Sequence, residues 1–85
     1  MKFAENEIVF FVKNHVFCAG KIISVDNDES CTIMTYEGRQ VNVKVHQSEL
    51  RKDFDKALAE FKSNNPEIQP DVEGLIDLLQ YLRLH

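Results

Sequence analysis

Four side chains in the first fifty residues could bind a metal or act as nucleophiles: His15, Cys18, Cys31 and His46. Structural zinc sites usually draw paired ligands from tight turns, and none of these four residues is paired at such a spacing. If the strands on either side of residues 26–30 pair, Cys31 lies opposite Val25 and Cys18 lies several residues further along. We therefore expect neither a metal site nor a disulfide.

Catalytic chemistry is not indicated either. Cys18 lies in an apolar segment, which raises the pKa of a thiol, and no third group is placed to orient a Cys–His pair. The acidic turn DNDES at 26–30 lacks the twelve-residue spacing and the terminal bidentate Glu of a calcium loop. No pair of groups is spaced for acid–base work. We predict a protein that is not an enzyme, with no catalytic residue and no cofactor.

Length and charge narrow the class of protein. The 85 residues are enough for one modest core, so we expect residues 1–85 to form a single domain. The net charge is -4, and residues 1–50 and 51–85 each carry five Lys/Arg against seven Asp/Glu. This even acidity disfavours duplex nucleic acid, which proteins bind largely by neutralising phosphates. No apolar run reaches the roughly 20 residues of a membrane span. Two cysteines without CxxC spacing indicate a cytoplasmic protein, or a nuclear one in a eukaryote.

The segment EIVFFVK, residues 7–13, is rich in branched and aromatic side chains and predicts a strand. Its two faces carry Ile8, Phe10 and Val12 on one side, and Val9 and Phe11 on the other. Both faces are apolar, whereas a strand with one face in water alternates with polar residues. We expect something to cover each face of this strand.

Three more strands are predicted, at 16–25, 31–36 and 39–45, separated by turns at 13–15, 26–30 and 37–38. Gly20 indicates a bulge or bend inside the second strand. Val41, Val43 and Val45 alternate inward in the last one. A two-residue loop at 37–38 sets Val43 opposite Thr32, whereas a bulge at Gly38 sets it opposite Ile33. Pairing of apolar residues favours the bulge.

The hydrophobic period changes after Ser48, which we predict to be the N-cap of a helix at 48–63. One face of that helix carries Leu50, Phe54, Ala57, Leu58 and Phe61. Two prolines then precede a second helix at 71–84, whose core stripe is Val72, Leu75, Ile76, Leu79 and Leu82. Three further residues widen that stripe: Leu78, Tyr81 and Leu84. They either pack on the rest of the protein or form a partner or homodimer interface, so the chain is expected to be a monomer or a homodimer through this helix.

The order of these elements resembles a family of SH3-like small β-barrels, of the Tudor, chromo-barrel and KOW type, over residues 3–50. The matching text is ENEIV, VFCAGKIISV, CTIMTY and VNVKVHQSEL, which ends in a single helical turn. The resemblance implies an α+β fold in which an antiparallel barrel, with strands at 7–46, precedes a helical hairpin. In Tudor and chromo-barrel members an aromatic cage grips methylated Lys or Arg. The cage positions fall near Val12, Cys18, Tyr36 and Val43 or Asn42, of which Tyr36 alone is aromatic. KOW-type members usually bind RNA or the ribosomal and transcription machinery.

Candidate ligand-binding residues at the barrel rim are Phe10, Phe17, Tyr36, Arg39 and Lys44. The alternative for Phe10 and Phe17 is that they pack beneath the C-terminal helices. Lys21 would join Arg39 and Lys44 in a small basic patch, although single charges on strands more often protect sheet edges.

Three functions remain open. The first is a protein-interaction module, with another protein as partner. The second is a nucleic-acid-associated module of KOW or Tudor type, which the net charge disfavours. The third is a small acidic inhibitor, of viral or mobile-element origin, that engages a basic cleft on a larger host protein.

Overall fold

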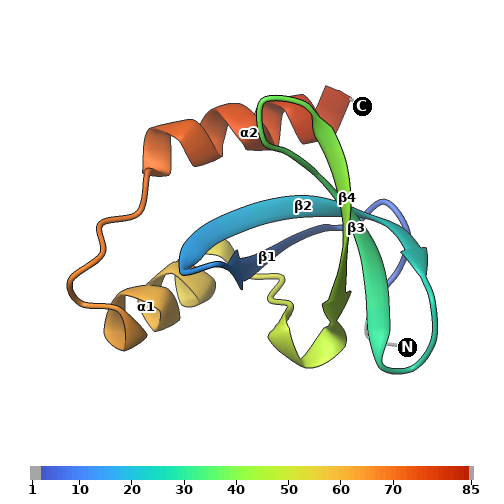
Figure 1. The fold of residues 1–85 in the computed structure, drawn as a ribbon, viewed down its shortest axis with the longest axis horizontal. Helices are drawn as coiled ribbons and strands as arrows, with labels where there is room; N and C mark the ends of the chain where they lie inside the picture. Colours follow the sequence, from blue (N-terminus) through green and yellow to red (C-terminus); the bar gives the residue numbers. More distant parts are fainter. Residues whose placement is uncertain (1–2, 85) are drawn as a thin grey trace.

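A computed structural model describes residues 3–84 (Figure 1). Four strands come first: β1 (Ile8–Lys13), β2 (Val16–Val25), β3 (Ser30–Tyr36) and β4 (Gln40–His46). A single 3-10 turn, η1 (Gln47–Glu49), follows, and two helices end the chain, α1 (Phe54–Asn64) and α2 (Val72–Leu84). The predicted α+β class is confirmed, and each strand begins and ends within one residue of its predicted bounds.

The strands form one antiparallel sheet in the order β1-β2-β3-β4. Asn14 and His15 make the tight turn between β1 and β2 with positive φ angles of 52° and 66°, the geometry that matches the twist of a two-residue hairpin. In the β3–β4 hairpin, Ile33 pairs with Val43 and Gly38 has a φ of 75°. The bulged register is therefore the correct one of the two alternatives, because it buries apolar residues together.

Gly20 does not make the predicted bulge. The register shift in β2 falls between Ile22 and Ser24. A Cβ atom on Gly20 would clash with the Ile33 side chain and lie 3.0 Å from the Met34 carbonyl oxygen. Glycine is required here because the two strands approach closely.

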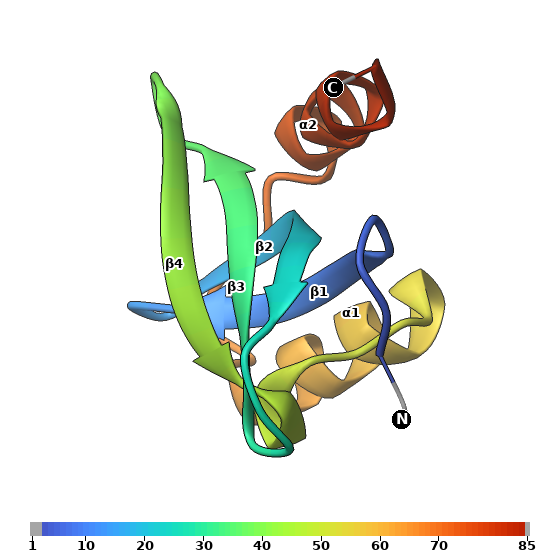
Figure 2. The same cartoon turned by 90° about the vertical axis from the view of Figure 1, so that its right-hand side faces the viewer.

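The sheet is strongly curved but does not close into a barrel (Figure 2). β1 and β4 are its two edges, and they are not hydrogen-bonded to each other. An isolated bridge instead joins the chain after η1 to β1: Phe10 N–H donates to the Arg51 carbonyl at 2.8 Å, and Arg51 N–H to the Phe10 carbonyl at 2.9 Å. The structure thus supports a curved four-stranded sheet, and the closed barrel is not observed.

Both faces of β1 are covered along most of the strand, as its composition predicts, although Val12 near its end is exposed. The inner face packs into a cluster that contains Val9, Phe11, Ile22 and Ile33, with Leu50 from the segment after η1. The outer face packs through Phe10 into a second cluster, which also contains Phe17, Ala19, Met34, Ala57, Phe61, Leu75 and Leu82. The curved sheet covers one side, and the two helices cover the other.

The predicted first helix at 48–63 is wrong at its start. Residues 47–49 form only η1, and α1 begins after Asp53, whose side-chain Oδ1 accepts a hydrogen bond from Lys56 N–H at 3.0 Å. Asp53 rather than Ser48 is therefore the N-cap of this helix. Leu50 does not belong to the helical face, because it is buried in the inner cluster instead.

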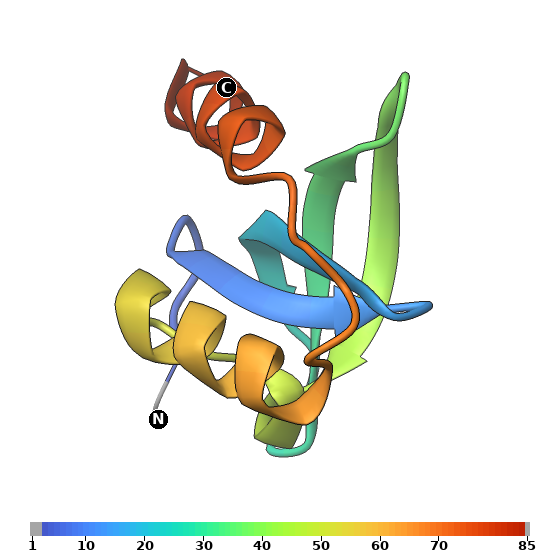
Figure 3. The same cartoon turned by 90° about the vertical axis from the view of Figure 1, so that its left-hand side faces the viewer.

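The two helices do not pack closely against each other, as a helical hairpin would, so this part of the prediction is wrong. α1 packs on β1, whereas α2 packs on β2 and β3. Both helices lie on the same side of the sheet, with β1 between them (Figure 3). The stripe of α2 also differs from the prediction. Leu75 and Leu82 are buried, whereas Ile76 is 47% exposed. Packing against the curved sheet has turned the helix so that Ile76 faces outward.

Candidate functional site

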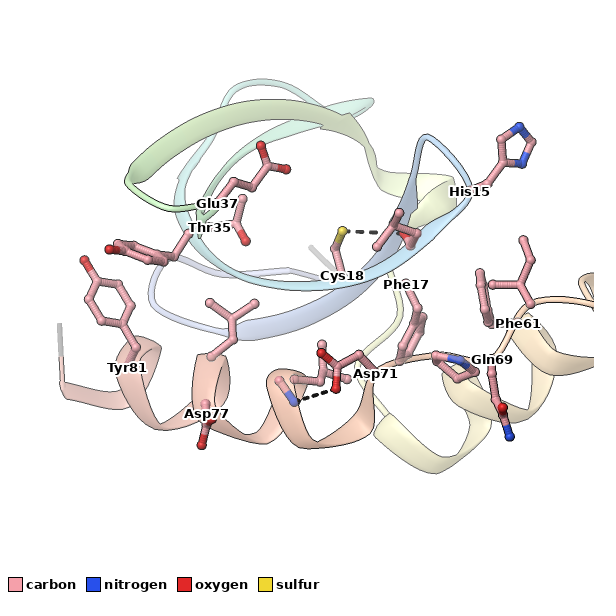
Figure 4. A pocket seen from close by; sticks show the side chains of 17 residues that line it. His15, Phe17, Cys18, Thr35, Glu37, Phe61, Gln69, Asp71, Asp77 and Tyr81 are labelled. Atoms are coloured by element: carbon pink, nitrogen blue, oxygen red, sulfur yellow. Dashed lines mark hydrogen bonds between the residues drawn. The ribbon is translucent and has the colours of Figure 1, made fainter.

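A groove of about 810 Å³ lies between α2 and the adjacent ends of β2 and β3 (Figure 4). Strand residues around Phe17 and Thr35 form one wall, and α2 forms the other. The linker between the helices closes one end through Ile68, Gln69 and Pro70. This volume falls in the range of about 300–1,000 Å³ that is typical of ligand sites in proteins.

The floor of the groove is apolar, apart from one hydroxyl group that is hydrogen-bonded within the protein. Phe17, Phe61 and Leu75 are buried there. Thr35 is buried too, and its hydroxyl donates a hydrogen bond to the Ala19 carbonyl at 2.8 Å. No buried side-chain polar atom of these floor residues lacks a hydrogen-bond partner, so their side chains offer surface mainly for apolar contact.

The rim of the groove exposes large hydrophobic side chains. Val16 is 57% exposed, Tyr36 is 45% exposed and Ile68 is 39% exposed. They come from the start of β2, the end of β3 and the linker, so three separate segments contribute. Exposed apolar residues that gather around one concavity are typical of interaction sites, whereas scattered ones are not.

Two tyrosines face each other across the groove. Tyr36 from β3 and Tyr81 from α2 have ring centroids 5.0 Å apart, with their planes tilted by 48°. Tilted aromatic pairs at this separation are favourable. In Figure 4, Tyr81 lies at the opposite end of the groove from His15. The pair therefore joins the sheet to α2 at the end of the groove away from the linker.

The charged groups that line the groove are acidic. Glu37, Asp71 and Asp77 are the acidic lining residues, and no Lys or Arg within residues 3–84 lines the groove. Asp71 caps α2 by accepting a hydrogen bond from Gly74 N–H at 3.0 Å, and Glu37 pairs with Lys13 at 3.2 Å. Figure 4 shows Asp77 directed away from the groove. Lys13 therefore offsets part of the charge of Glu37, and Asp71 is the further carboxylate at the rim.

Cys18 lines the groove but is not set up as a nucleophile. Burial, and then the charge of Glu37, raise the pKa of its thiol above the ordinary value. Its Sγ lies 3.5 Å from the Val16 carbonyl, to which the thiol donates. A thiol held in its neutral form is a poor nucleophile at neutral pH.

Phe10 and Phe17 are buried beneath the helices, which is the alternative that the sequence left open for them. The Phe10 ring lies 5.3 Å from Phe54, and the Phe17 ring lies 5.5 Å from Phe61, centroid to centroid. Phe17 still forms part of the groove floor. Phe10 lies outside this groove, because it belongs to the seam between β1 and α1.

The basic residues do not join the groove. Arg39 and Lys44 are exposed on the β3–β4 hairpin and on β4, and neither lines it. Lys44 acts locally: hydrogen bonds from Ser24 and then Thr32, together with the Lys44 charge, lower the pKa of Asp26. That carboxylate thus belongs to the turn between β2 and β3.

The three α2 residues predicted as an interface separate in space. Leu78 and Tyr81 are half-buried and line the groove, whereas Leu84 is 82% exposed and lies outside it. The sequence missed Val16 and Ile68 at the rim. Hydrophobic periodicity could not predict that these two residues share a rim. They come together only because the linker passes the start of β2 in the folded chain.

Residues 3–84 show no sign of a metal site or of a membrane-spanning helix. Those residues contain no cluster of three or more His, Cys, Asp or Glu side chains able to hold a metal ion. Neither helix has the length and apolar character that crossing a membrane requires. The structure therefore directs attention to the groove.

Comparisons with known proteins add no family to these observations. No family model, no curated protein and no solved structure matches the chain. The function is therefore argued from the geometry and charge of the groove.

Proposed function

We propose that this protein is a non-enzymatic protein-interaction module. Its groove between α2 and the ends of β2 and β3 binds a partner segment that carries apolar side chains beside basic ones. The observation that carries the proposal is the apolar rim of Val16, Tyr36 and Ile68 around an apolar floor. The two parts of the proposed partner chemistry rest on separate features of the groove.

The apolar part follows from the exposed surface. Val16 and Ile68 are exposed aliphatic side chains, and burial of their surface against a partner would remove apolar area from water, which favours association. Tyr36 adds a flat ring with a polar end, a combination that is enriched in protein interfaces. A partner would anchor apolar side chains over Phe17 and Leu75.

The basic part follows from the carboxylates. Asp71 and Glu37 line the groove, the latter partly offset by Lys13, and no Lys or Arg among the residues that the structure describes lines it. A partner segment with Lys or Arg next to its apolar anchors would find complementary charge there. Phosphates would be repelled instead, which gives a nucleic-acid function less support at this site. An acidic inhibitor would also bind a basic partner. It is therefore a special case of the proposed interaction module, in which the partner is a protein that is inhibited.

The finer fold assignment is also a proposal. We infer that the sheet is an open relative of SH3-like small barrels, because η1 follows β4 and the Phe10–Arg51 bridge returns the chain to β1. Tyr36 occupies the cage position that the resemblance implies, and its aromatic neighbour Tyr81 comes from α2. A cytoplasmic location fits the two free cysteines.

The test uses two synthetic peptides of alternating Leu and Lys, or Leu and Glu, followed by NMR titration of the whole protein. The Leu–Lys peptide is expected to shift the signals of Val16, Tyr36 and Leu78 and to bind more tightly than the Leu–Glu peptide. Val16→Asp should abolish the shifts. Val12→Asp is the matched control, because Val12 is 47% exposed on the same hairpin but does not line the groove.

Two outcomes would contradict the proposal. One is equal binding of the Leu–Lys peptide by the Val16→Asp and Val12→Asp variants, which would place the contact elsewhere. The other is salt-sensitive binding of single-stranded RNA at low salt that is lost when Arg39 and Lys44 are neutralised, which would favour the nucleic-acid alternative.

A further inference from the structure

The outward face of α2 carries a stripe that the groove does not use. Glu73, Ile76, Gln80 and Arg83 recur at i, i+3, i+7 and i+10, so they lie along one side of the helix. All four are exposed, and Ile76 is 47% exposed although it is a large aliphatic side chain. None of the four lines the groove between α2 and the sheet. This stripe is therefore a separate surface.

Three residues of the stripe, Ile76, Gln80 and Arg83, line one side of a second, smaller groove of about 470 Å³. Its apolar lining comes from Ile8 and Phe10 on β1, Phe54 on α1, and Ile76 and Leu79 on α2. The apolar surface next to Ile76 thus extends across three elements and is not confined to one side chain. A partner that covers Ile76 would also reach this lining.

The charges along the stripe have a definite order. Glu73 lies in the first turn of α2 and Arg83 in the last, with Ile76 and Gln80 between them. The other cation at the smaller groove, Lys52, is already paired with Glu7 at 3.1 Å and lies over the Phe3 ring. Arg83 is therefore the cation of this stripe that an approaching partner would meet. Glu73 is the anion at the other end, and Asp77 is a further exposed acid beside Ile76.

We propose that the occupant of this surface is a second copy of the chain, with the two α2 helices antiparallel about a two-fold axis near residue 78. Ten residues separate Glu73 from Arg83, or about 15 Å along the helix. An antiparallel copy therefore brings Glu73 of each chain to Arg83 of the other, once at each end. Both Ile76 side chains then lie beside the axis, each over the smaller groove of the opposite chain.

Self-complementarity is what favours a second copy over an unrelated partner. A two-fold interface requires one patch to match itself in the reversed direction, and a stripe with opposite charges at its two ends meets that requirement. This dimer leaves Leu78 and Tyr81 in the groove, so it differs from a dimer through those residues. It is also independent of the proposed function, since the groove stays open to a partner.

The experiment measures mass by sedimentation equilibrium across protein concentrations up to about 1 mM, where a dimer with a dissociation constant of about 1 mM is still populated. The wild-type mass is expected to rise from 9.9 kDa toward twice that value. Ile76→Asp should keep the protein monomeric. Arg83→Glu and Glu73→Arg should each weaken dimerisation about tenfold or more, because like charges then meet at both ends.

Mixing the two charge variants provides the sharpest control. In a mixed dimer, Glu73 of the Arg83→Glu chain meets Arg83 of the Glu73→Arg chain at one end. At the other end the two introduced side chains meet, an acid from the first chain and a base from the second. An equimolar mixture should therefore dimerise like the wild type, and circular dichroism establishes that each variant is folded.

Two results would overturn the proposed dimer. One is a wild-type mass that stays at 9.9 kDa at every concentration. The other is a mixture of the charge variants that stays monomeric while the wild type dimerises. Leu–Lys peptide binding by a monomeric Ile76→Asp variant is expected, which separates this test from that of the groove.

Discussion

The ring of Tyr36, at the end of β3, packs against the ring of Tyr81, on α2, with centroids 5.0 Å apart. This contact joins the sheet to the last helix at one end of the groove. It depends on residues that are far apart in the chain, so it forms only when α2 has docked.

Removal of this ring pair should therefore loosen α2. In a double-mutant cycle with Tyr36→Ala and Tyr81→Ala, urea unfolding is expected to give a coupling energy of about 0.5–1.5 kcal/mol, the usual range for aromatic pairs. The cycle cancels other contacts of each tyrosine. Strictly additive losses would show that the two rings do not stabilise each other.

Gly20→Ala should destabilise the sheet. Its new methyl group would press on the Ile33 side chain and the Met34 carbonyl, in the close approach between β2 and β3. Overpacking of this kind costs about 1–3 kcal/mol. Gly74→Ala is the comparison: its methyl group would displace the Asp71 side chain that caps α2, at a cost of about 0.5–2 kcal/mol, which the better helix propensity of alanine partly offsets. It should therefore lose less stability than Gly20→Ala. If thermal unfolding ranks the two variants in the opposite order, the close approach is not what requires glycine.

Asp53→Ala should cost more than Ser48→Ala. Asp53 accepts the capping bond from Lys56 N–H at the start of α1, and loss of a cap costs about 0.5–2 kcal/mol. The Ser48 hydroxyl only shares a hydrogen bond with His46 Nδ1 at 2.8 Å, in exposed η1. Denaturant midpoints of the two variants check this, and a larger loss for Ser48→Ala would restore Ser48 as the cap.

Cys18 should react slowly in the folded protein. Because burial raises the pKa of its thiol, the reactive thiolate is rarer at any given pH than in the unfolded chain, whose thiol has a pKa of about 8.5. Alkylation by iodoacetamide at pH 8 should be slower in buffer than in urea, and the pH at which the folded rate rises should be higher. Cys31→Ser removes the other thiol so that the measurement reports Cys18 alone. Equal rates in the two conditions would contradict the assigned burial.

Local pattern was enough for the first half of the chain. Alternation and turn residues place all four strands, and the pairing of Ile33 with Val43 follows from the gain of burying apolar residues together. The two apolar faces of β1 likewise require the two coverings that the structure shows. These features depend on residues close together in the sequence, or on which residues are apolar. Both can be read from the sequence.

Helix starts and glycine roles were harder to predict. Ser48 and Asp53 are both acceptable caps, and the choice between them was made by Leu50, which the inner cluster takes out of the helical face. Gly20 is compatible with a bulge or with close packing, and only the position of Ile33 distinguishes the two. In both cases a distant contact outweighs the local preference.

The groove itself is a product of tertiary structure. The chain order shows that α2 has more apolar residues than one face needs, but the curvature of the sheet decides that Leu78 turns inward and Ile76 outward. Val16 and Ile68 meet at one rim because the linker crosses the start of β2. The sequence alone therefore determined which segments are strands and helices, since hydrophobic period is local. Only the folded chain decided which side chains share a surface, because that depends on how curved elements pack over long separations.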